Sequence, residues 1–254
     1  MTRPTAMALE YFLVSYRRTW RGTIFSAFVT PVLFLLAMGK TVGTYIDARG
    51  GLEVAYLDYI APGVLASTGL QIGIFEGSFA VYSAFHWSRC YHAMRVSPLS
   101  PSNILGGHLS YAMLRVALSA TGFVLVMTAF GSIHSATGVL ALPVAVGVGA
   151  SVTPLVFAYS AVISTEGLFA VLFRFVMVPM SLFAGVFFPV DAMPAPARVL
   201  AYLSPLWHGV ELCRAATLAT STAWGVPVHA GYLLLWSVAG FLIARRVFVR
   251  KLTD

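Results

Sequence analysis

Residues 116–165 read VALSATGFVLVMTAFGSIHSATGVLALPVAVGVGASVTPLVFAYSAVIST and contain no Asp, Glu, Lys or Arg. A membrane-spanning helix needs about 20 mostly apolar residues, so this stretch is long enough for two spans and the turn between them. The rest of the chain has a similar character: of its 254 residues, 59% are hydrophobic and 10% are charged, and the mean hydropathy is +0.84. The composition therefore predicts an integral membrane protein.

Further uncharged stretches lie on both sides of this segment, at residues 22–39, 59–75, 175–190 and 232–244. Backbone polar groups within lipid must be satisfied internally, which leaves helices or a closed β-barrel as spanning structures. These stretches are too long and too continuously apolar for the alternating strands of a barrel. The sequence therefore predicts an all-α membrane fold, a single transmembrane domain over residues 1–254. Its six spans are expected at residues 22–41, 58–83, 106–130, 138–163, 168–189 and 229–246.

Lys and Arg collect on one side of these spans. Ten of the sixteen basic residues fall in the N-terminal segment, the loop after the second span and the C-terminal tail: Arg3, Arg17, Arg18, Arg21, Arg89, Arg95, Arg245, Arg246, Arg250 and Lys251. The opposite loops mix Lys40, Arg49, Arg198 and Arg214 with Asp47, Glu53, Asp58, Asp191 and Glu211. Positively charged loops favour the cytoplasmic side, so both termini of this multi-pass protein are expected to be cytoplasmic. The bias also accounts for the pI near 9.7, and no nucleic-acid partner is expected.

The segment before the first span has an amphipathic pattern. Within residues 5–21, apolar and aromatic side chains recur at helical spacing with arginines between them: Leu9, Phe12, Leu13, Tyr16 and Trp20. Such a pattern is typical of a helix that lies in the membrane interface. An N-terminal extension of the first span is the alternative.

Two further segments outside the spans have helical character. Residues 86–96 are basic and aromatic and precede Pro98 and Pro101, which end a helix. A short helix here is suited to dock a cytoplasmic protein, although an ordinary solvated loop is the alternative. Residues 190–220 contain two apolar helices, at 199–203 and 207–218, that are too short to span and are expected to be re-entrant or interfacial.

Three charges fall inside predicted spans: Glu76, Arg115 and Arg174. Intramembrane charges are costly and are usually paired or functional, so Glu76 is expected to pair with Arg115 or Arg174, unless both arginines reach the headgroups. The second span also carries Gly69, Gly73 and Gly77, a spacing that lets helix backbones approach closely within one subunit or between two.

Motifs for catalysis and energy supply are absent from the sequence. Gly39-Lys40-Thr41 resembles the end of a Walker A loop, but Phe34 stands where its first glycine would be required. No spacing typical of a metal site or of a catalytic triad is present, so neither a metal nor a catalytic residue is expected. One alternative class is an ion-gradient transporter or channel that uses Glu76 as a proton site. The other is an intramembrane enzyme or a structural subunit. The lack of internal repeats weighs against a secondary transporter.

Three stretches resemble the type-2 ABC exporter permeases, and within them the NodJ-like lipooligosaccharide and drug exporter branch. They are DYIAPGVLASTGLQ at 58–71 with FEGSF at 75–79, YHAMRVSPLSPSNILGGHL at 91–109, and LFAGVFFPVDAMP to LAYLSPLWHGVELCRAATL within 182–218. The resemblance covers nearly the whole chain. It implies a permease subunit without an ATPase site of its own, and therefore no cofactor on this chain, with ATP and Mg on separate cytoplasmic ABC ATPase subunits.

The same resemblance implies roles for particular residues. A second permease subunit, identical or paralogous, would complete the exporter in the cell inner (plasma) membrane. Residues 86–96 would be the coupling helix in a groove of the ATPase, with contacts from Trp87, Arg89, Tyr91, His92 and Arg95. The translocation path or dimer seam would include Gly69, Gly73, Glu76, Phe187, Trp207, His208 and Glu211. Cargo in this family is glycolipid, lipooligosaccharide or hydrophobic drug, exported from the cytoplasm.

Overall fold

The computed structural model describes residues 3–50, 52 and 54–253 and is helical, with no β-strand in these ranges. Glu53, one of the acids assigned to the first opposite loop, lies outside the described residues. Six helical segments within this part of the chain are long and apolar enough to cross a membrane. They confirm the predicted all-α membrane fold.

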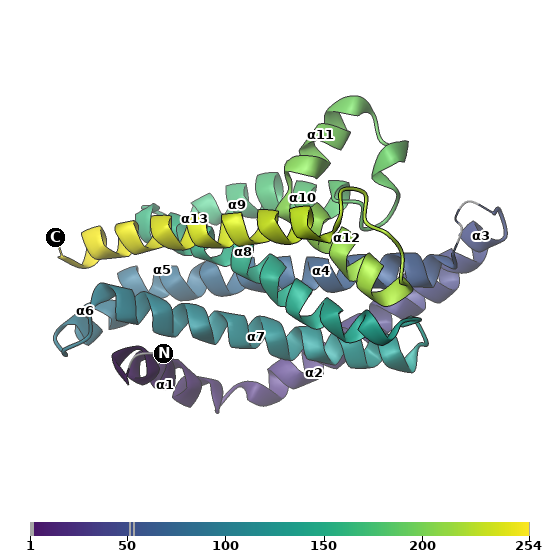
Figure 1. The fold of residues 1–254 in the computed structure, drawn as a ribbon. Coiled ribbons are helices and arrows are strands. Elements are labelled where there is room, and N and C mark those ends of the chain that lie inside the picture. The colour runs from purple at the N-terminus through teal and green to yellow at the C-terminus, as the bar shows by residue number, and fades with distance from the viewer. Residues whose placement is uncertain (1–2, 51, 53, 254) are drawn as a thin grey trace.

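The six spans are built from single or joined helices (Figure 1). The first joins α2 (Trp20–Phe34), the π-helix η1 (Leu35–Val42) and α3 (Gly43–Asp47), and the second joins α4 (Tyr56–Gly77) and α5 (Phe79–His86). The third is α7 (Pro101–Ala129), and the fourth is η2 (Ala136–Leu140) with α8 (Ala141–Val162). The fifth joins η3 (Glu166–Leu168), α9 (Phe169–Leu172), η4 (Phe173–Met177) and α10 (Val178–Phe183), and the sixth is α13 (Val226–Thr253).

Four predicted span boundaries were wrong by more than a turn. The first span ends at Asp47 instead of residue 41, and the third begins at Pro101 instead of residue 106. The fifth span ends at Phe183 instead of residue 189, because Gly185 has a φ of +75° and turns the chain out of the helix. The sixth continues to Thr253 instead of residue 246, since its basic residues extend the same helix beyond the apolar stretch. The third span begins at Pro101, where the Ser100 side chain caps the helix by accepting from the Asn103 amide at 3.2 Å.

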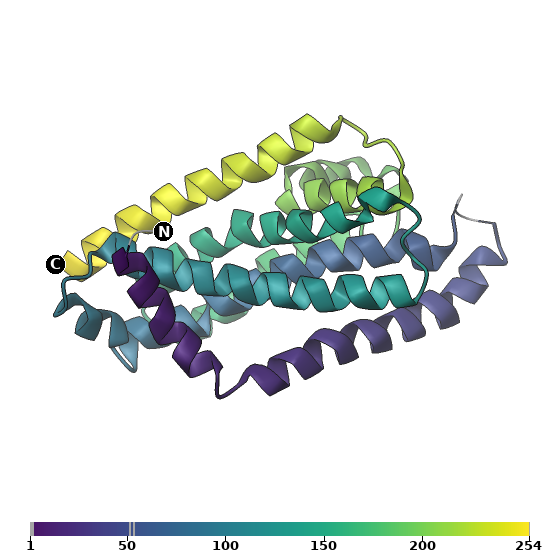
Figure 2. The same cartoon turned by 60° about the horizontal axis from the view of Figure 1, so that its bottom comes forward.

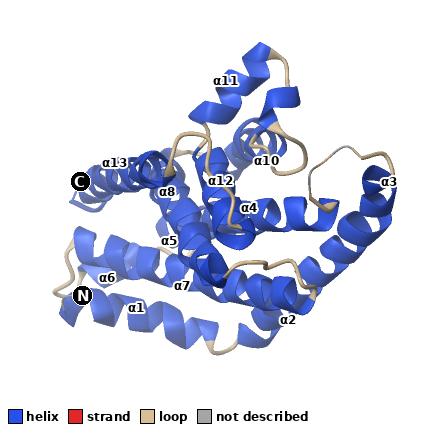
Figure 3. Cartoon of the chain, turned by 45° about the vertical axis from the view of Figure 1, so that its right-hand side comes forward, coloured by secondary structure: helices blue, strands red, loops and turns tan. Residues whose placement is uncertain are grey.

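Helices α4 and α8 form the centre of the bundle, and α2 and α13 lie at its periphery (Figure 3). The core contains buried side chains of both central helices, among them Leu65 and Leu70 from α4 and Val148 from α8. The apolar windows of α4 and α8 are about half buried, whereas those of the fifth and sixth spans are mostly exposed. These outer spans therefore have faces that only lipid or a second protein can cover.

Both chain termini lie at one end of the bundle, which we call the terminal end, and α3 lies at the opposite, far end (Figures 1 and 2). Helix α1 (Arg3–Tyr16) crosses α7 near the terminal end, and α6 (Cys90–Arg95) lies at the same end. The helix predicted over 5–21 therefore stops at Tyr16, and Trp20 already belongs to α2. The helix predicted over 86–96 is shorter as well, because residues 87–89 separate it from α5.

The re-entrant segment predicted over 190–220 contains η5 (Val190–Ala192), α11 (Ala195–Leu203) and α12 (Pro205–Leu218). Helix α12 is packed into the bundle against α4 and α8, and the side chains of Leu206 and Val210 are completely buried. Helix α11 stands off the bundle, with Val199 and Leu200 exposed. The second of the two short helices is therefore part of the core, whereas the first contributes only Ala201 to it.

Candidate functional site

The surface around α6 at the terminal end is basic and exposed. The chain enters α6 through Arg89, whose φ of +51° is a left-handed conformation that costs a non-glycine residue of order 1–3 kcal/mol. Arg89 and His92 are exposed, and Trp87 is 57% exposed. These three side chains are therefore accessible to a partner.

Arg95 and Tyr91, the other two residues assigned to the coupling contact, are held by contacts within the subunit. Arg95 donates to the Leu99 carbonyl at 3.0 Å and to the Leu252 carbonyl at 3.4 Å, which ties α6 to the end of α13. Tyr91 is completely buried. The expectation that Tyr91 touches the ATPase directly does not fit this structure, because its side chain points into the core; both residues position α6 instead.

Tyr91 connects α6 to two other helices through His108 of α7. The Tyr91 hydroxyl is hydrogen-bonded to His108 Nδ1, and the His108 ring stacks on Phe12 of α1 with centroids 4.0 Å apart. Burial raises the pKa of the Tyr91 phenol well above its usual range, so the hydroxyl keeps its proton. Gly107 allows this arrangement, because a Cβ there would lie 2.8 Å from the Leu9 amide nitrogen of α1. We call Phe12, Tyr91 and His108 the aromatic junction.

An ion pair lies within the spans, two helical turns after His108 on α7. Arg115 Nη2 is 3.2 Å from Glu76 Oε1, and the two side chains are 22% and 14% exposed. Arg115 also donates to the Tyr111 hydroxyl at 3.3 Å, and its guanidinium lies 5.2 Å from the ring centre of Tyr16 in α1. The pair therefore links α4, α7 and the end of α1. Arg174, the other arginine considered for Glu76, is exposed on η4 and has no ion pair among the described residues.

The glycine ladder of α4 packs inside the subunit. A Cβ at Gly69 would overlap the Ala145 carbonyl oxygen of α8, and one at Gly73 would lie 3.2 Å from the Gly149 oxygen. The space beside both glycines is therefore filled by α8. The expectation that Gly69 and Gly73 form a seam between subunits or line a path is corrected, because their small size serves the contact between the two central helices.

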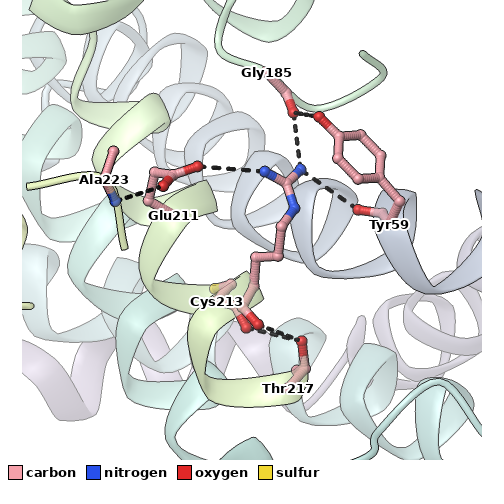
Figure 4. Close-up of polar contacts among 7 residues, drawn as sticks. Tyr59, Gly185, Glu211, Cys213, Thr217 and Ala223 are labelled. Carbon is pink, nitrogen blue, oxygen red and sulfur yellow. Dashed lines mark hydrogen bonds and ion pairs between the residues drawn. The ribbon is translucent and has the colours of Figure 1, made fainter. Parts of the chain in front are cut away.

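A polar cluster at the far end fixes α12 to the second span (Figure 4). Arg214 donates to the Gly185 carbonyl at 3.0 Å and forms an ion pair with Glu211 at 3.4 Å. Its guanidinium lies 4.0 Å from the ring centre of Tyr59, and the second Glu211 oxygen accepts from the Ala223 amide at 3.3 Å. We call Tyr59, Glu211 and Arg214 the far-end clamp. Glu211 was predicted to be a functional residue. Tyr59 and Arg214 were not, because their contact joins positions that are 155 residues apart in the sequence.

Two histidines connect α12 to the last span. His208 and His229 are buried, and their Nδ1 atoms are 2.9 Å apart. His208 Nε2 must donate to the Tyr202 carbonyl at 3.1 Å, so the Nδ1 of a neutral His208 accepts from His229. Burial lowers the pKa of His208 to about 4, which keeps the ring neutral. His208 and the neighbouring Trp207 are therefore buried parts of α12, and Trp207 lines a cavity of about 160 Å³ together with Glu211 and Arg214.

A cavity of about 300 Å³ lies between α2, α4, α7 and the turn after α10. Phe187 lines it, as do Phe34, Phe75 and Phe123. The remaining wall includes uncharged hydrogen-bonding side chains: Ser26, Thr30, Ser67, Thr68, Gln71, Ser119 and Ser181. Gln71 donates to Ser67 at 3.1 Å, and the Ser181 hydroxyl is buried without a hydrogen-bond partner in the described structure. We call this space the hydroxyl-lined cavity, and no charged side chain lines it. Of the residues assigned to a path, Phe187 alone is part of its wall.

No group of three or more His, Cys, Asp or Glu side chains arranged for a metal ion occurs among the described residues. Glu76, which a proton-driven transporter could use, is held in an ion pair. The structure thus offers three features, namely an exposed basic surface, an aromatic junction behind it and an uncharged cavity within the spans.

Residues 6–218 match the family model described as ABC-2 type transporter. Among curated proteins, Nodulation protein J of Rhizobium leguminosarum bv. viciae is 26% identical over 94% of this chain and 91% of its own length. Nodulation protein J of Neorhizobium galegae is 22% identical over the full length of both chains. The inner membrane transport permease YadH of Escherichia coli K12 is 24% identical over 88% of this chain and 89% of its own.

Proposed function

The chain belongs to the ABC-2 type transporter family, and we propose that it is the membrane-spanning permease subunit of an ATP-driven exporter in the cell inner (plasma) membrane. Its cargo is an amphipathic or lipid-linked molecule, such as a glycolipid, lipooligosaccharide or hydrophobic drug, that leaves the cytoplasm. ATP and Mg belong to a separate ATPase subunit. The relatives named for nodulation and for inner-membrane transport support this proposal.

The proposed orientation places the terminal end in the cytoplasm. Helix α6, the end of α13 and the α1–α2 connection lie toward this end (Figures 1 and 2), and each carries basic residues. Short basic loops favour the cytoplasmic side of a membrane. The far-end clamp and α12 then lie at the external side.

The observation that carries the proposal is the aromatic junction. The exposed side chains of α6 are available to an ATPase, and buried Tyr91 in the same helix is bonded to His108 of the third span. Phe12 of α1 packs on the other face of His108. A displacement of α6 by an ATPase therefore reaches a spanning helix and the interfacial helix through direct contacts.

A second permease subunit, identical or paralogous, would cover the exposed apolar faces of the outer spans. Phe25 and Leu33 of α2, and Phe175 of the fifth span, are more than half exposed. Lipid can cover such side chains, but the hydroxyl-lined cavity lies between these two spans. Polar side chains within a membrane usually face protein or an aqueous cavity. The same face of a second subunit would therefore enclose the path for the cargo.

The lining of the cavity favours an amphipathic cargo. Phenylalanine rings provide an apolar surface, and seven hydroxyl or amide side chains provide hydrogen bonds without charge. Binding the cargo differently in inward- and outward-open states would make the cycle directional. The alternative function, an ion-gradient transporter, relied on Glu76 as a proton site. Glu76 is instead paired with Arg115 and lies outside the lining of this cavity.

Co-purification tests the proposal. The tagged chain is co-expressed with a candidate ABC ATPase subunit from the same genome. The complex is isolated in detergent for wild type, Arg89→Ala/His92→Ala and the control Arg246→Ala, which removes an exposed charge from α13. We expect a stable complex for wild type and the control and loss of ATPase from the double variant. A chain that purifies alone and moves a solute under an ion gradient without ATP would overturn the proposal.

A further inference from the structure

Basic side chains from three elements surround a second cavity, of about 350 Å³, at the terminal end. His86 is the last residue of α5, Arg89 and His92 belong to the turn and helix of α6, and Lys251 lies in the last turn of α13. Phe85 and Ala161 complete the lining. No acidic residue lines this space, which we call the basic cavity.

The charges of the basic cavity are not balanced by the described part of the protein. None of its four basic side chains takes part in an ion pair there. A cation in the last turn of a helix is favoured by the helix dipole, which accounts for Lys251. Arg89 directly precedes α6, where the dipole disfavours a cation, and its backbone is left-handed. An anion in the cavity would neutralise this arrangement.

The surroundings of the cavity favour lipid as the source of that anion. Val162, next to Ala161, is 59% exposed, and Val249, next to the end of α13, is 38% exposed. Helix α13 also presents Leu234, Leu235 and Leu242 outward along its length, as expected of a lipid-facing helix. The basic cavity therefore adjoins the lipid-facing surface of the bundle.

The depth of the cavity fits a phospholipid headgroup. Lys251 follows Arg246 by five residues of continuous helix, which is about 8 Å at 1.5 Å per residue. The headgroup region on each side of the hydrocarbon core is about 5–8 Å thick. If Arg246 marks the edge of the hydrocarbon, Lys251 lies among the headgroups, within reach of a phosphate.

We propose that the basic cavity binds the phosphate of an anionic phospholipid from the cytoplasmic leaflet. The assignment of the leaflet rests on the orientation given under the proposed function. Basic pockets between spanning helices on the cytoplasmic side are suited to anionic headgroups. Because Arg89 and His92 also belong to the exposed surface of α6, the bound lipid lies beside the ATPase contact and holds the α5–α6 turn in place.

Thermal unfolding of the purified chain in detergent tests this site without the ATPase. Dioleoyl phosphatidylglycerol, dioleoyl phosphatidylcholine and sodium phosphate are each titrated into wild type, Arg89→Gln/Lys251→Gln and the control Arg18→Gln/Arg246→Gln. The control removes two exposed cations outside the cavity. We expect phosphatidylglycerol alone to raise the unfolding temperature, with binding about tenfold weaker in the cavity variant and unchanged in the control.

Native mass spectrometry of the folded chain provides the second readout, because it counts phosphatidylglycerol molecules retained even if a variant is less stable. Retention of phosphatidylglycerol by the cavity variant at the wild-type level would overturn the proposal, as would equal loss in the control. Stabilisation by sodium phosphate alone would identify a site for a free anion instead. Displacement of the lipid by added ATPase would assign the cavity to the protein contact. Failure to co-purify with an ATPase leaves these lipid measurements intact, so the two proposals fail separately.

Discussion

The hydroxyl of Tyr91 in α6 is hydrogen-bonded to Nδ1 of His108 in the third span, and both side chains are buried. His108 in turn stacks on Phe12 of α1. Three segments that are separate along the chain therefore meet at one imidazole ring. In the proposed permease, movement of α6 driven by a separate ATPase would reach the third span and α1 through this ring.

We expect Tyr91→Phe and His108→Leu to be non-additive. Each single change leaves the other polar group buried without its partner and should lower the free energy of unfolding by about 1–3 kcal/mol. In the double variant neither partner is left unsatisfied, so its cost should be well below the sum of the two. Unfolding in detergent measures the cycle, and strictly additive costs would show that the two groups do not interact.

Glu76→Gln should destabilise the chain, because Arg115 then keeps an unbalanced charge at a position that is 22% exposed. Loss of one member of a buried pair costs about 3–5 kcal/mol, and the partial exposure here favours the lower end. Glu76→Gln/Arg115→Gln should recover part of this loss. Arg174→Gln is the control and should change the free energy of unfolding by less than about 0.5 kcal/mol, since Arg174 is exposed and unpaired in the described structure. A silent Glu76→Gln variant would contradict the structural role of the pair.

Gly69→Ala and Gly231→Ala should have opposite effects. A Cβ at Gly69 overlaps the backbone of α8, so α4 and α8 must separate, at a cost of about 1–3 kcal/mol. A Cβ at Gly231 in α13 meets nothing within 4 Å, and alanine there should stabilise the helix by up to about 1 kcal/mol. Midpoints of thermal unfolding compare the two variants. Equal effects would mean that α4 and α8 are not in close contact.

The far-end clamp should depend on the forked shape of the Arg214 guanidinium, which reaches Glu211 and the Gly185 carbonyl together. Lysine keeps the charge but cannot make both contacts with the same geometry. We therefore expect Arg214→Lys to accelerate amide hydrogen exchange in α12 and in residues 219–225. The control is Arg49→Lys, an exposed far-end arginine. Unchanged exchange in Arg214→Lys would show that α12 is held by apolar packing alone.

Local pattern was enough to predict the spans but not their irregularities. The uncharged stretch at 116–165 predicted α7 and α8 because length and hydropathy suffice for a spanning helix. The π-helical turns of η1 and η4 were not predicted, although prolines lie nearby, at Pro31 within α2 and Pro179 in α10. A proline removes a backbone donor, but which neighbouring turn adjusts depends on packing.

The features of the sites that the sequence did not predict depend on contacts between segments that are distant in the chain. Glu76 was recognised as a residue that requires a partner, since a charge inside a span stands out. The choice of Arg115 over Arg174, and the meeting of Tyr59 with Arg214, depend on how the helices rotate against one another. Tyr91 looked like a docking residue because its neighbours are basic and aromatic. Its burial arises from contacts with distant segments, namely His108 of α7 and Phe248 of α13.

The most direct test of the proposed transmission is a distance measurement across the proposed exporter, assembled from two permease subunits and the ATPase. Spin labels at Tyr45→Cys, a 73% exposed far-end position, are placed on a Cys90→Ala/Cys213→Ala background, and the distance between subunits is compared with and without ATP. We predict that ATP shifts this distance in the parent protein, and that His108→Leu abolishes the shift while the complex still assembles and hydrolyses ATP. The same shift in the His108→Leu complex, or no shift in the parent, would contradict transmission through the aromatic junction.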